Sequence, residues 1–309
     1  MCDLCPRQCK ADRSLGETGF CGANDSYIKI SRAALHFWEE PCISGTRGSG
    51  TVFFSYCSLK CVYCQNTEIS RGLSGAEVDT ARLADIMLEL QEKGAHNINL
   101  VTPTHYVNHI IAALNIARNR GLKIPIVYNT GGYEMPSVIE RLRGYVDIFL
   151  TDYKYANNKD AFKYSAVNDY VEYADAALEK MVEIAPVAFE KKQKPEDDEP
   201  AIMTSGVIVR HLLLPGKLIE AKNILKRLYS KYGNSIYYSI MSQYTPLSGV
   251  SSNIGFDENL LHPVNPDEYD RLISYASRLG IENAFIQDGS AASESFIPPF
   301  DLTGVLKKQ

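Results

Sequence analysis

The chain has 309 residues, a formal net charge of −5 and an apolar content of 45%, which suits one large α/β domain with at most a small appendage. The mild acidity gives no electrostatic reason to expect a nucleic-acid partner. No stretch approaches the roughly 20 apolar residues that cross a bilayer. The first residues also lack the basic start and apolar run of a signal peptide. We therefore expect a cytoplasmic protein with no membrane or nucleic-acid partner.

Secondary structure is predicted to begin at about residue 51. Residues 1–50 mix glycine, proline, cysteine and charged residues without a regular apolar period, which predicts an irregular extension. The predicted strands are 51–55, 97–101, 124–128, 146–150, 206–214 and 236–241. The predicted helices are 80–93, 106–120, 136–143, 169–185, 218–232 and a last one that begins after Asn265. The charged, proline-bearing segment 191–200 is predicted to be a mobile surface loop.

Strands that alternate with helices indicate parallel strands joined by right-handed crossovers. Six such units predict an α/β fold, a partial (β/α)6 TIM-like barrel over residues 51–309 with a C-terminal helix. Residues 1–50 would form a separate cysteine-rich N-terminal extension. In such barrels the chemistry lies at the carboxyl ends of the strands, so motifs that follow predicted strands are the candidate functional residues.

Cysteine placement is the strongest functional signal. All eight cysteines lie in the first 64 residues, and the remaining 245 have none. Because disulfides rarely persist in a reducing compartment, clustered cysteines there indicate metal binding or catalysis. The cysteines are Cys2, Cys5, Cys9, Cys21, Cys42, Cys57, Cys61 and Cys64.

Cys57, Cys61 and Cys64 directly follow the first predicted barrel strand. Structural zinc sites and electron-transfer clusters normally have four protein ligands. Three thiolates on a four-iron cluster leave one iron open to a small molecule that carries an amino and a carboxylate group. The alternatives are a zinc knuckle, or a metal that these three cysteines share with one of the others.

The spacing, the position after the first strand and Tyr63 just before the last cysteine resemble the signature of the radical S-adenosylmethionine (SAM) superfamily. The resemblance implies an oxygen-sensitive 4Fe–4S cluster on Cys57, Cys61 and Cys64, and an oxidoreductase. One electron, from a low-potential donor such as flavodoxin or ferredoxin, would cleave SAM to a 5′-deoxyadenosyl radical. Tyr63 would lie beside the adenine.

The whole chain is similar to pyruvate formate-lyase activating enzyme-like proteins, most densely in 1–21, 33–70, 99–106 and 206–216. That resemblance implies hydrogen abstraction from a glycine of a partner enzyme. It also assigns SAM-binding roles to residues after three strands. These residues are Asn129 and Thr130, Asp152 and Lys154, and Arg210. The alternatives are a surface pair for Asp152 and Lys154, and a buried structural ion pair for Arg210.

Two departures from the family pattern bear on the SAM site and the substrate. Where most of the superfamily has Gly-Gly-Glu after the second strand, this chain reads Thr102-Pro-Thr104-His105. The two threonine hydroxyls or the histidine offer equivalent hydrogen bonds to the SAM amino group, while His105 also suits a substrate contact or a helix cap. The segment 242–246 lacks the histidine that known activases carry after the sixth strand.

Cys2, Cys5, Cys9 and Cys21 make a second set, spaced by two, three and eleven residues. Four thiolates suit a closed site for zinc or for a second iron-sulfur cluster. A tail of free thiols is the alternative. Cys42 has no partner at metal spacing, so we expect a small buried hydrophobe.

Three functions compete. The first is an activase that takes hydrogen from a glycine of a partner protein. The second is a radical SAM enzyme that modifies a peptide or a small metabolite. The third is a non-catalytic iron-sulfur or zinc protein, and the open fourth ligand position argues against it.

Overall fold

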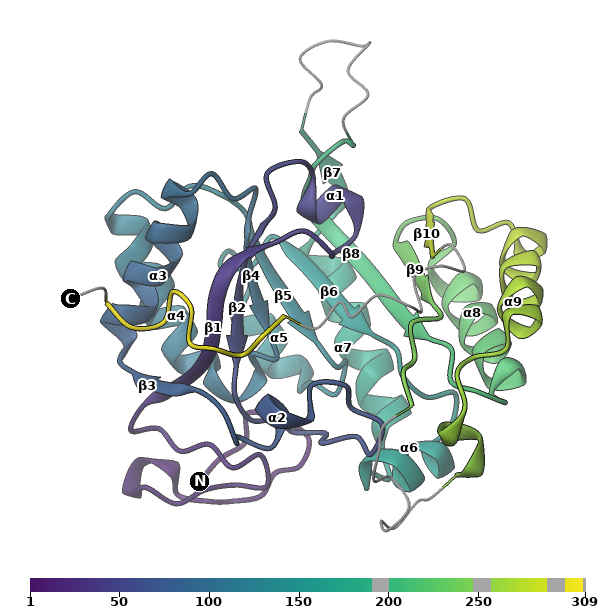
Figure 1. Cartoon of the computed structure of the whole chain (residues 1–309), viewed down its shortest axis with the longest axis horizontal. Helices are drawn as coiled ribbons and strands as arrows, with labels where there is room; N and C mark the ends of the chain where they lie inside the picture. The colour runs from purple at the N-terminus through teal and green to yellow at the C-terminus, as the bar shows by residue number, and fades with distance from the viewer. Residues whose placement is uncertain (191–199, 247–256, 288–297, 308–309) are drawn as a thin grey trace.

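The computed structural model describes residues 1–190, 200–246, 257–287 and 298–307 (Figure 1). Its strands are β1 (Ile28–His36), β2 (Ser49–Phe54), β3 (Ala76–Val78), β4 (Ile98–Val101), β5 (Ile126–Thr130), β6 (Ile148–Asp152), β7 (Ala188–Phe189), β8 (Met203–Leu212), β9 (Tyr237–Met241) and β10 (Ala284–Ile286). Its α-helices are α1 (Pro41–Ser44), α2 (Thr67–Ser70), α3 (Thr80–Glu92), α4 (Val107–Asn119), α5 (Pro136–Arg141), α6 (Asn158–Ser165), α7 (Tyr170–Ile184), α8 (Leu218–Tyr232) and α9 (Pro266–Leu279). Short 3-10 turns are η1 (Arg13–Leu15), η2 (Thr104–Tyr106) and η4 (Glu258–Leu261).

One sheet organises the described part of the chain, in the order β10-β9-β8-β6-β5-β4-β2-β1-β3. Every pair from β2 to β10 is parallel. At the opposite edge, β1 pairs antiparallel with β2 and β3. The short strand β7 lies outside this strand order and pairs antiparallel with β8. Helices α3 and α4 lie at one end of the curved sheet and α8 and α9 at the other (Figure 1). This is the predicted α/β architecture with a mostly parallel, partial barrel.

The sequence patterns that predicted these elements correspond to real packing. Every residue of β2 and of β5 is buried, as expected for strands covered on both faces. Helix α3 begins at Asp79, whose side chain accepts a hydrogen bond from the Arg82 amide, and it buries the predicted apolar face. Helix α9 begins with an Asn265 cap and Pro266, and ends at Gly280 in the left-handed region.

The prediction that residues 1–50 are irregular is wrong for residues 28–44. Strand β1 buries Ile28, Ile30 and Ala33 and forms an antiparallel ladder with β2, so this segment belongs to the sheet. Residue 50, the predicted boundary, lies within β2. The division into two domains therefore stays a prediction. Of the predicted mobile loop 191–200, all but the last residue lies outside the described residues.

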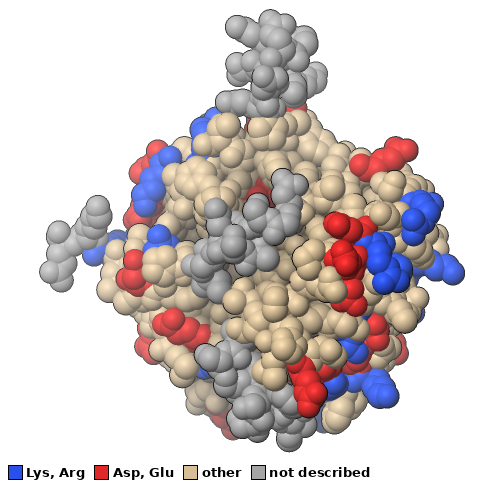
Figure 2. All heavy atoms as spheres, turned by 45° about the vertical axis from the view of Figure 1, so that its right-hand side comes forward, with Lys and Arg blue, Asp and Glu red and all other residues tan. Residues whose placement is uncertain are grey.

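None of the helices in the described ranges combines the length and the apolar character that a membrane crossing requires. On the face drawn in Figure 2, acidic and basic side chains lie interspersed rather than sorted by sign.

Candidate active site

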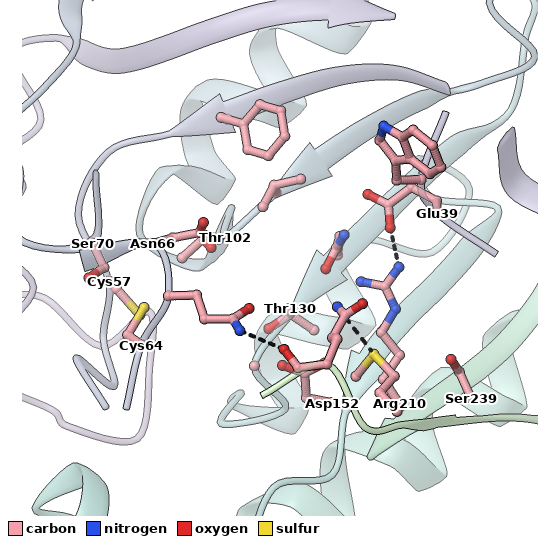
Figure 3. Close-up of a pocket in the computed structure, with 18 of the residues that line it drawn as sticks. Glu39, Cys57, Cys64, Asn66, Ser70, Thr102, Thr130, Asp152, Arg210 and Ser239 are labelled. Atoms are coloured by element: carbon pink, nitrogen blue, oxygen red, sulfur yellow. Dashed lines mark hydrogen bonds and ion pairs between the residues drawn. The ribbon is translucent and has the colours of Figure 1, made fainter. Parts of the chain in front are cut away.

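A cavity of about 360 Å³ opens at the carboxyl ends of the parallel strands, a volume typical of small-molecule sites. The predicted site residues that line it are Cys57, Cys61, Cys64, Thr102, Asn129, Thr130, Asp152, Lys154 and Arg210. Figure 3 shows Cys57 and Cys64 on one side, Glu39 and Arg210 on the other, and Asp152 between them. The fold thus brings together residues that are up to 153 positions apart in the sequence.

The cysteine loop leaves β2 through two left-handed residues. Tyr56 has φ 77° and Lys60 has φ 50°. Both lie in the left-handed region of the backbone, which residues other than glycine rarely adopt. The Leu59 amide lies 3.4 Å from Cys57 Sγ, and the Tyr56 amide donates to the carbonyl of Ile69 in α2 at 2.8 Å. The backbone is therefore folded tightly around the thiols, and strain of this kind concentrates at functional sites.

Hydrogen-bond donors surround the sulfur of Cys61. Ser165 Oγ donates to Cys61 Sγ at 2.9 Å and Tyr155 Oη at 3.6 Å. Burial raises the pKa of the Cys57 thiol to about 12 and also raises the pKa of Cys64. The free thiols of Cys57 and Cys64 are therefore neutral at pH 7, and a metal would have to displace their protons. Hydroxyl donors to sulfur stabilise the charge of a bound iron-sulfur cluster, so the surroundings fit one.

No three His, Cys, Asp or Glu side chains in the described ranges are grouped so that they could hold a single metal ion. A four-iron cluster binds each thiolate to a different iron, so the sulfurs of Cys57, Cys61 and Cys64 need not converge. The donor set and its spacing fit a cluster.

The ends of β5 and β6 are held together by Tyr170. The Lys154 amide donates to Tyr170 Oη at 2.8 Å, and that hydroxyl lies 3.1 Å from the carbonyl oxygen of Gly131 and 3.2 Å from that of Asp152. Gly132, at φ 81°, passes so close that a Cβ there would lie 2.2 Å from the Asp152 carbonyl oxygen. This contact fixes the turn that follows Asn129 and Thr130 at the end of β5.

We expect Gly132→Ala to lower the free energy of unfolding by clearly more than Gly144→Ala. Gly144 has a similar φ of 77° but nothing within 4 Å of its added Cβ, so it bears only the backbone cost of about 1–2 kcal/mol. At Gly132 the clash with Asp152 adds to that cost. Urea unfolding of both variants measures the difference, and equal losses would contradict the close packing of β5 and β6.

Asp152 and Lys154 form an ion pair at the cavity wall, with Lys154 Nζ 2.5 Å from Asp152 Oδ2. Burial alone would favour the neutral amine, but Asp152 outweighs it and holds the pKa of Lys154 well above its usual value. Both side chains are about a fifth to a quarter exposed. The wall therefore offers a cation and an anion side by side, the pairing that an amino acid's carboxylate and ammonium require.

Arg210 lies in a buried ion triad. Its guanidinium binds Glu40 through both oxygens, at 2.8 and 2.7 Å, and also binds Glu39, which accepts from Asn99 Nδ2 at 2.8 Å. Burial would raise the pKa of Glu40, but Arg210 lowers it, so the carboxylate stays charged. Arg210 therefore forms the ion pair and also lines the cavity, and its contact with SAM stays a prediction. Two carboxylates on one guanidinium leave this side of the cavity with a net negative charge.

Thr104 does not face the cavity but binds the buried carboxyl of Glu134. The Thr104 hydroxyl donates to Glu134 Oε1 at 2.5 Å, the Thr130 hydroxyl donates to the same oxygen, and Tyr128 Oη lies 3.4 Å from Oε2. Glu134 is fully buried, and burial raises its pKa to about 7. This carboxyl joins the loops that follow β4 and β5.

The raised pKa of Glu134 predicts a pH-dependent stability. The folded state holds the proton up to about pH 7 and the unfolded state only to about 4.5, so unfolding free energy falls as pH rises through this window, by about 3 kcal/mol in total. In Glu134→Gln this contribution is absent. Between pH 4.5 and 7.5 we therefore expect the native chain to lose about 3 kcal/mol of unfolding free energy relative to Glu134→Gln. Parallel pH profiles would contradict it.

Tyr63 and His105 are not among the cavity-lining residues. Tyr63 is buried and its hydroxyl donates to Tyr155 Oη at 3.1 Å. His105 is buried, with Nε2 2.8 Å from the carbonyl oxygen of Ser55. Burial lowers the pKa of His105 to about 3, so the ring is neutral and its Nε2–H donates. His105 thus supports the end of β2, just before the cysteine loop, and SAM contacts for these two residues stay predictions.

Sequence reasoning missed Glu39, Glu40 and Glu134, which hold the cavity walls. The only signal for Glu134 was a Gly-Gly-Tyr-Glu run directly after a predicted strand, with Gly-Gly-Glu absent from its expected place. Ser165 and Tyr155, the donors to Cys61, come from more than 90 residues away. No local motif marks them.

Residues 51–227 match the family profile described as the radical SAM superfamily. The chain belongs to the radical SAM superfamily. The match covers β2 to α8, which carry all of the predicted site residues except those of the N-terminal cysteine set. Radical SAM proteins use a 4Fe–4S cluster and SAM, and the cysteine loop and polar strand ends of this radical SAM protein meet in one cavity.

An uncharacterised protein of Methanocaldococcus jannaschii is 28% identical over 254 residues, which are 79% of this chain and 66% of that protein. Solved structures with a similar fold include SuiB of Streptococcus suis bound to S-adenosylmethionine (14% identity, TM-score 0.49, 79% of this chain and 52% of that one). Another is the FeFe-hydrogenase maturase HydG of Carboxydothermus hydrogenoformans (14% identity, TM-score 0.46, 73% of this chain and 49% of that one). This chain spans about half the length of those solved chains and just under two thirds of the curated relative.

Proposed function

We propose that this radical SAM protein cleaves SAM reductively and uses the product to abstract hydrogen from a glycine of a partner enzyme. The observation that carries the first part is the single cavity lined both by Cys57, Cys61 and Cys64 and by the polar ends of β4, β5 and β6. When bound, a 4Fe–4S cluster and SAM supply a 5′-deoxyadenosyl radical by one-electron cleavage of a carbon–sulfur bond.

The chain's own residues would bind and orient these groups. The three loop thiolates would hold three irons and leave the fourth open to the methionine end of SAM. Lys154 offers a permanent cation to the SAM carboxylate, and Asp152, 2.5 Å away, offers an anion to the ammonium or a ribose hydroxyl. Asn129 and Thr130 line the same wall.

Burial and hydrogen bonding would tune the cluster and protect it. The Cys61 thiol is buried and Cys57 and Cys64 are half-buried, which strengthens the electrostatic effect of nearby donors. Ser165 and Tyr155 donate to Cys61 Sγ and would stabilise added negative charge on the cluster. A low-potential protein such as flavodoxin or ferredoxin would supply the electron.

The proposed substrate rests on the resemblance to pyruvate formate-lyase activating enzyme-like proteins along the chain. A glycine of a partner enzyme is the target in relatives of that type. Modification of a peptide or small metabolite is the competing outcome, because segment 242–246 lacks the activase histidine.

The test uses anaerobically reconstituted protein, reduced flavodoxin and SAM, with a glycyl radical enzyme added as the partner. We expect 5′-deoxyadenosine and a glycyl-radical doublet in the electron paramagnetic resonance (EPR) spectrum of the partner. Deuterium placed at that glycine should appear in the 5′-deoxyadenosine. If 5′-deoxyadenosine forms without deuterium and without the glycyl-radical doublet, glycine is not the target. If no 5′-deoxyadenosine forms at all, the protein does not cleave SAM.

A further inference from the structure

Four thiols outside the cavity lie together in the N-terminal segment. Burial, and with it the neighbouring Cys21 and Cys2 thiols, raises the pKa of Cys5, and burial with the neighbouring Cys2 and Cys9 thiols raises the pKa of Cys21. A Cβ added to Gly19 would stand 2.5 Å from Cys9 Sγ and 3.9 Å from Cys21 Sγ, so only glycine leaves room beside these sulfurs. None of the four is in a disulfide. They form one pocket of thiols.

A buried cation with an unused donor lies against these thiols. Arg13 is only 3% exposed, and its Nη1 lies 3.9 Å from Cys2 Sγ. Asp25 balances part of its charge at 2.9 Å, but the buried Arg13 Nε has no hydrogen-bond partner among the described residues. The Ala23 amide lies 3.4 Å from Cys21 Sγ. Buried donors of this kind call for an acceptor that carries negative charge.

The N-terminal segment is docked on the cavity's cysteine loop. Arg7 donates to the carbonyl of Ser58 at 2.9 Å and to that of Ser165 at 2.6 Å. Its guanidinium lies 3.7 Å from the ring centroid of Phe20, whose carbonyl accepts from Lys60 Nζ at 2.6 Å. In Figure 1 this segment runs along the end of the sheet where α2 lies.

The same two cations link the two cysteine sets. Arg7 interacts electrostatically with both Cys5 and Cys57. Lys60 interacts with both Cys21 and Cys57. These two positively charged side chains therefore lie close both to the N-terminal thiols and to the loop that lines the cavity. Cations there would balance negative charge on both sides.

We propose that Cys2, Cys5, Cys9 and Cys21 hold a second 4Fe–4S cluster that delivers electrons to the cluster of the cavity. Four thiolates would complete its coordination and leave no iron open, as in electron-transfer clusters. Zinc is the competing occupant, because four thiolates also suit a closed tetrahedral site. Cys9 is exposed, which gives an external donor protein access to this end.

The electron-delivery part rests on the proposed SAM cleavage. A reduced flavodoxin or ferredoxin gives one electron to the N-terminal cluster, which is reduced from the 2+ to the 1+ state. That cluster would then pass the electron to the cluster of the cavity, on whose loop Arg7 and Lys60 lie, and would return to 2+. No atoms are transferred, and the external donor is the only species consumed.

The decisive measurement is the number of clusters in the native chain, reconstituted without air. Mössbauer spectroscopy and iron and sulfide analysis should give about eight of each per chain. The Cys57→Ser/Cys61→Ser/Cys64→Ser variant should retain about four irons and the EPR signal of a reduced cluster. The Cys2→Ser/Cys5→Ser/Cys9→Ser/Cys21→Ser variant should keep the other four. About four irons in the native chain, or zinc at the N-terminal site, would overturn the second cluster.

Electron delivery has its own readout. In the four-serine N-terminal variant, reduction of the remaining cluster by flavodoxin, followed by rapid-freeze EPR, should slow at least about tenfold. Reduction by dithionite, a small reagent with its own access to the loop, should change little. An unchanged flavodoxin rate would overturn the relay. Neither the iron count nor the rate of cluster reduction requires SAM. A failure of either measurement is therefore distinct from a failure of SAM cleavage.

Discussion

Cys61→Ala will form 5′-deoxyadenosine at less than about 1% of the native rate, because on the proposed assignment it removes a cluster ligand, and because two buried hydroxyls lose their acceptor. Ser165 and Tyr155 both donate to this sulfur. The measurement is product formation by anaerobically reconstituted protein with dithionite and SAM, read together with the cluster's EPR signal.

Cys42→Ala is the matched control. Cys42 is also buried, but it packs in a separate apolar cluster with Ile43 and Met203 and does not line the cavity. This variant should keep the native rate of product formation, with at most a modest loss of stability. Native product formation by Cys61→Ala would contradict the assignment of the cysteine loop.

Arg210→Met will lower the free energy of unfolding by about 3–5 kcal/mol, since it leaves two buried carboxylates without a counter-charge. Glu39 and Glu40 are 7% and 5% exposed and both bind Arg210. The measurement is urea unfolding of the metal-free chain at pH 7. As a comparison, Arg143→Ala disrupts an exposed pair with Glu140 and Glu183 and should cause a much smaller change.

A compensated variant separates lost charge balance from lost packing. Arg210→Met/Glu39→Gln/Glu40→Gln removes the carboxylate charges together with their partner, so it should be more stable than Arg210→Met alone. If the triple variant is no more stable, or if Arg210→Met unfolds like the native chain, the ion triad does not stabilise the fold in this way.

The fold was predictable because its strands and helices have strong, regular apolar periods. Helix α3 begins at residue 80, where its apolar period predicted, and helix α9 begins after the Asn265 cap that the sequence indicated. Strand β1 was missed because its nine residues include Lys29, Arg32 and His36 and lie in a segment rich in turn formers. Its identity as a strand comes from pairing with β2, which is tertiary information.

The candidate site was predictable only as far as the strand-end rule reaches. That rule placed Asp152 and Lys154 in the cavity correctly, because β6 ends there. It could not show that Arg210 is bound by carboxylates 170 and 171 positions away. Nor could it show that Thr104 binds a carboxyl 30 positions further along the chain instead of facing the cavity. Such partners depend on how separate loops pack.

The most direct test of the account is electron–nuclear double resonance on the reduced cavity cluster, with SAM labelled with nitrogen-15 and oxygen-17 in its methionine part. The account predicts hyperfine coupling from both labels to one iron, because that iron has no cysteine. A cluster that binds SAM without such coupling, or one in which a fourth protein thiolate occupies that iron, would contradict it.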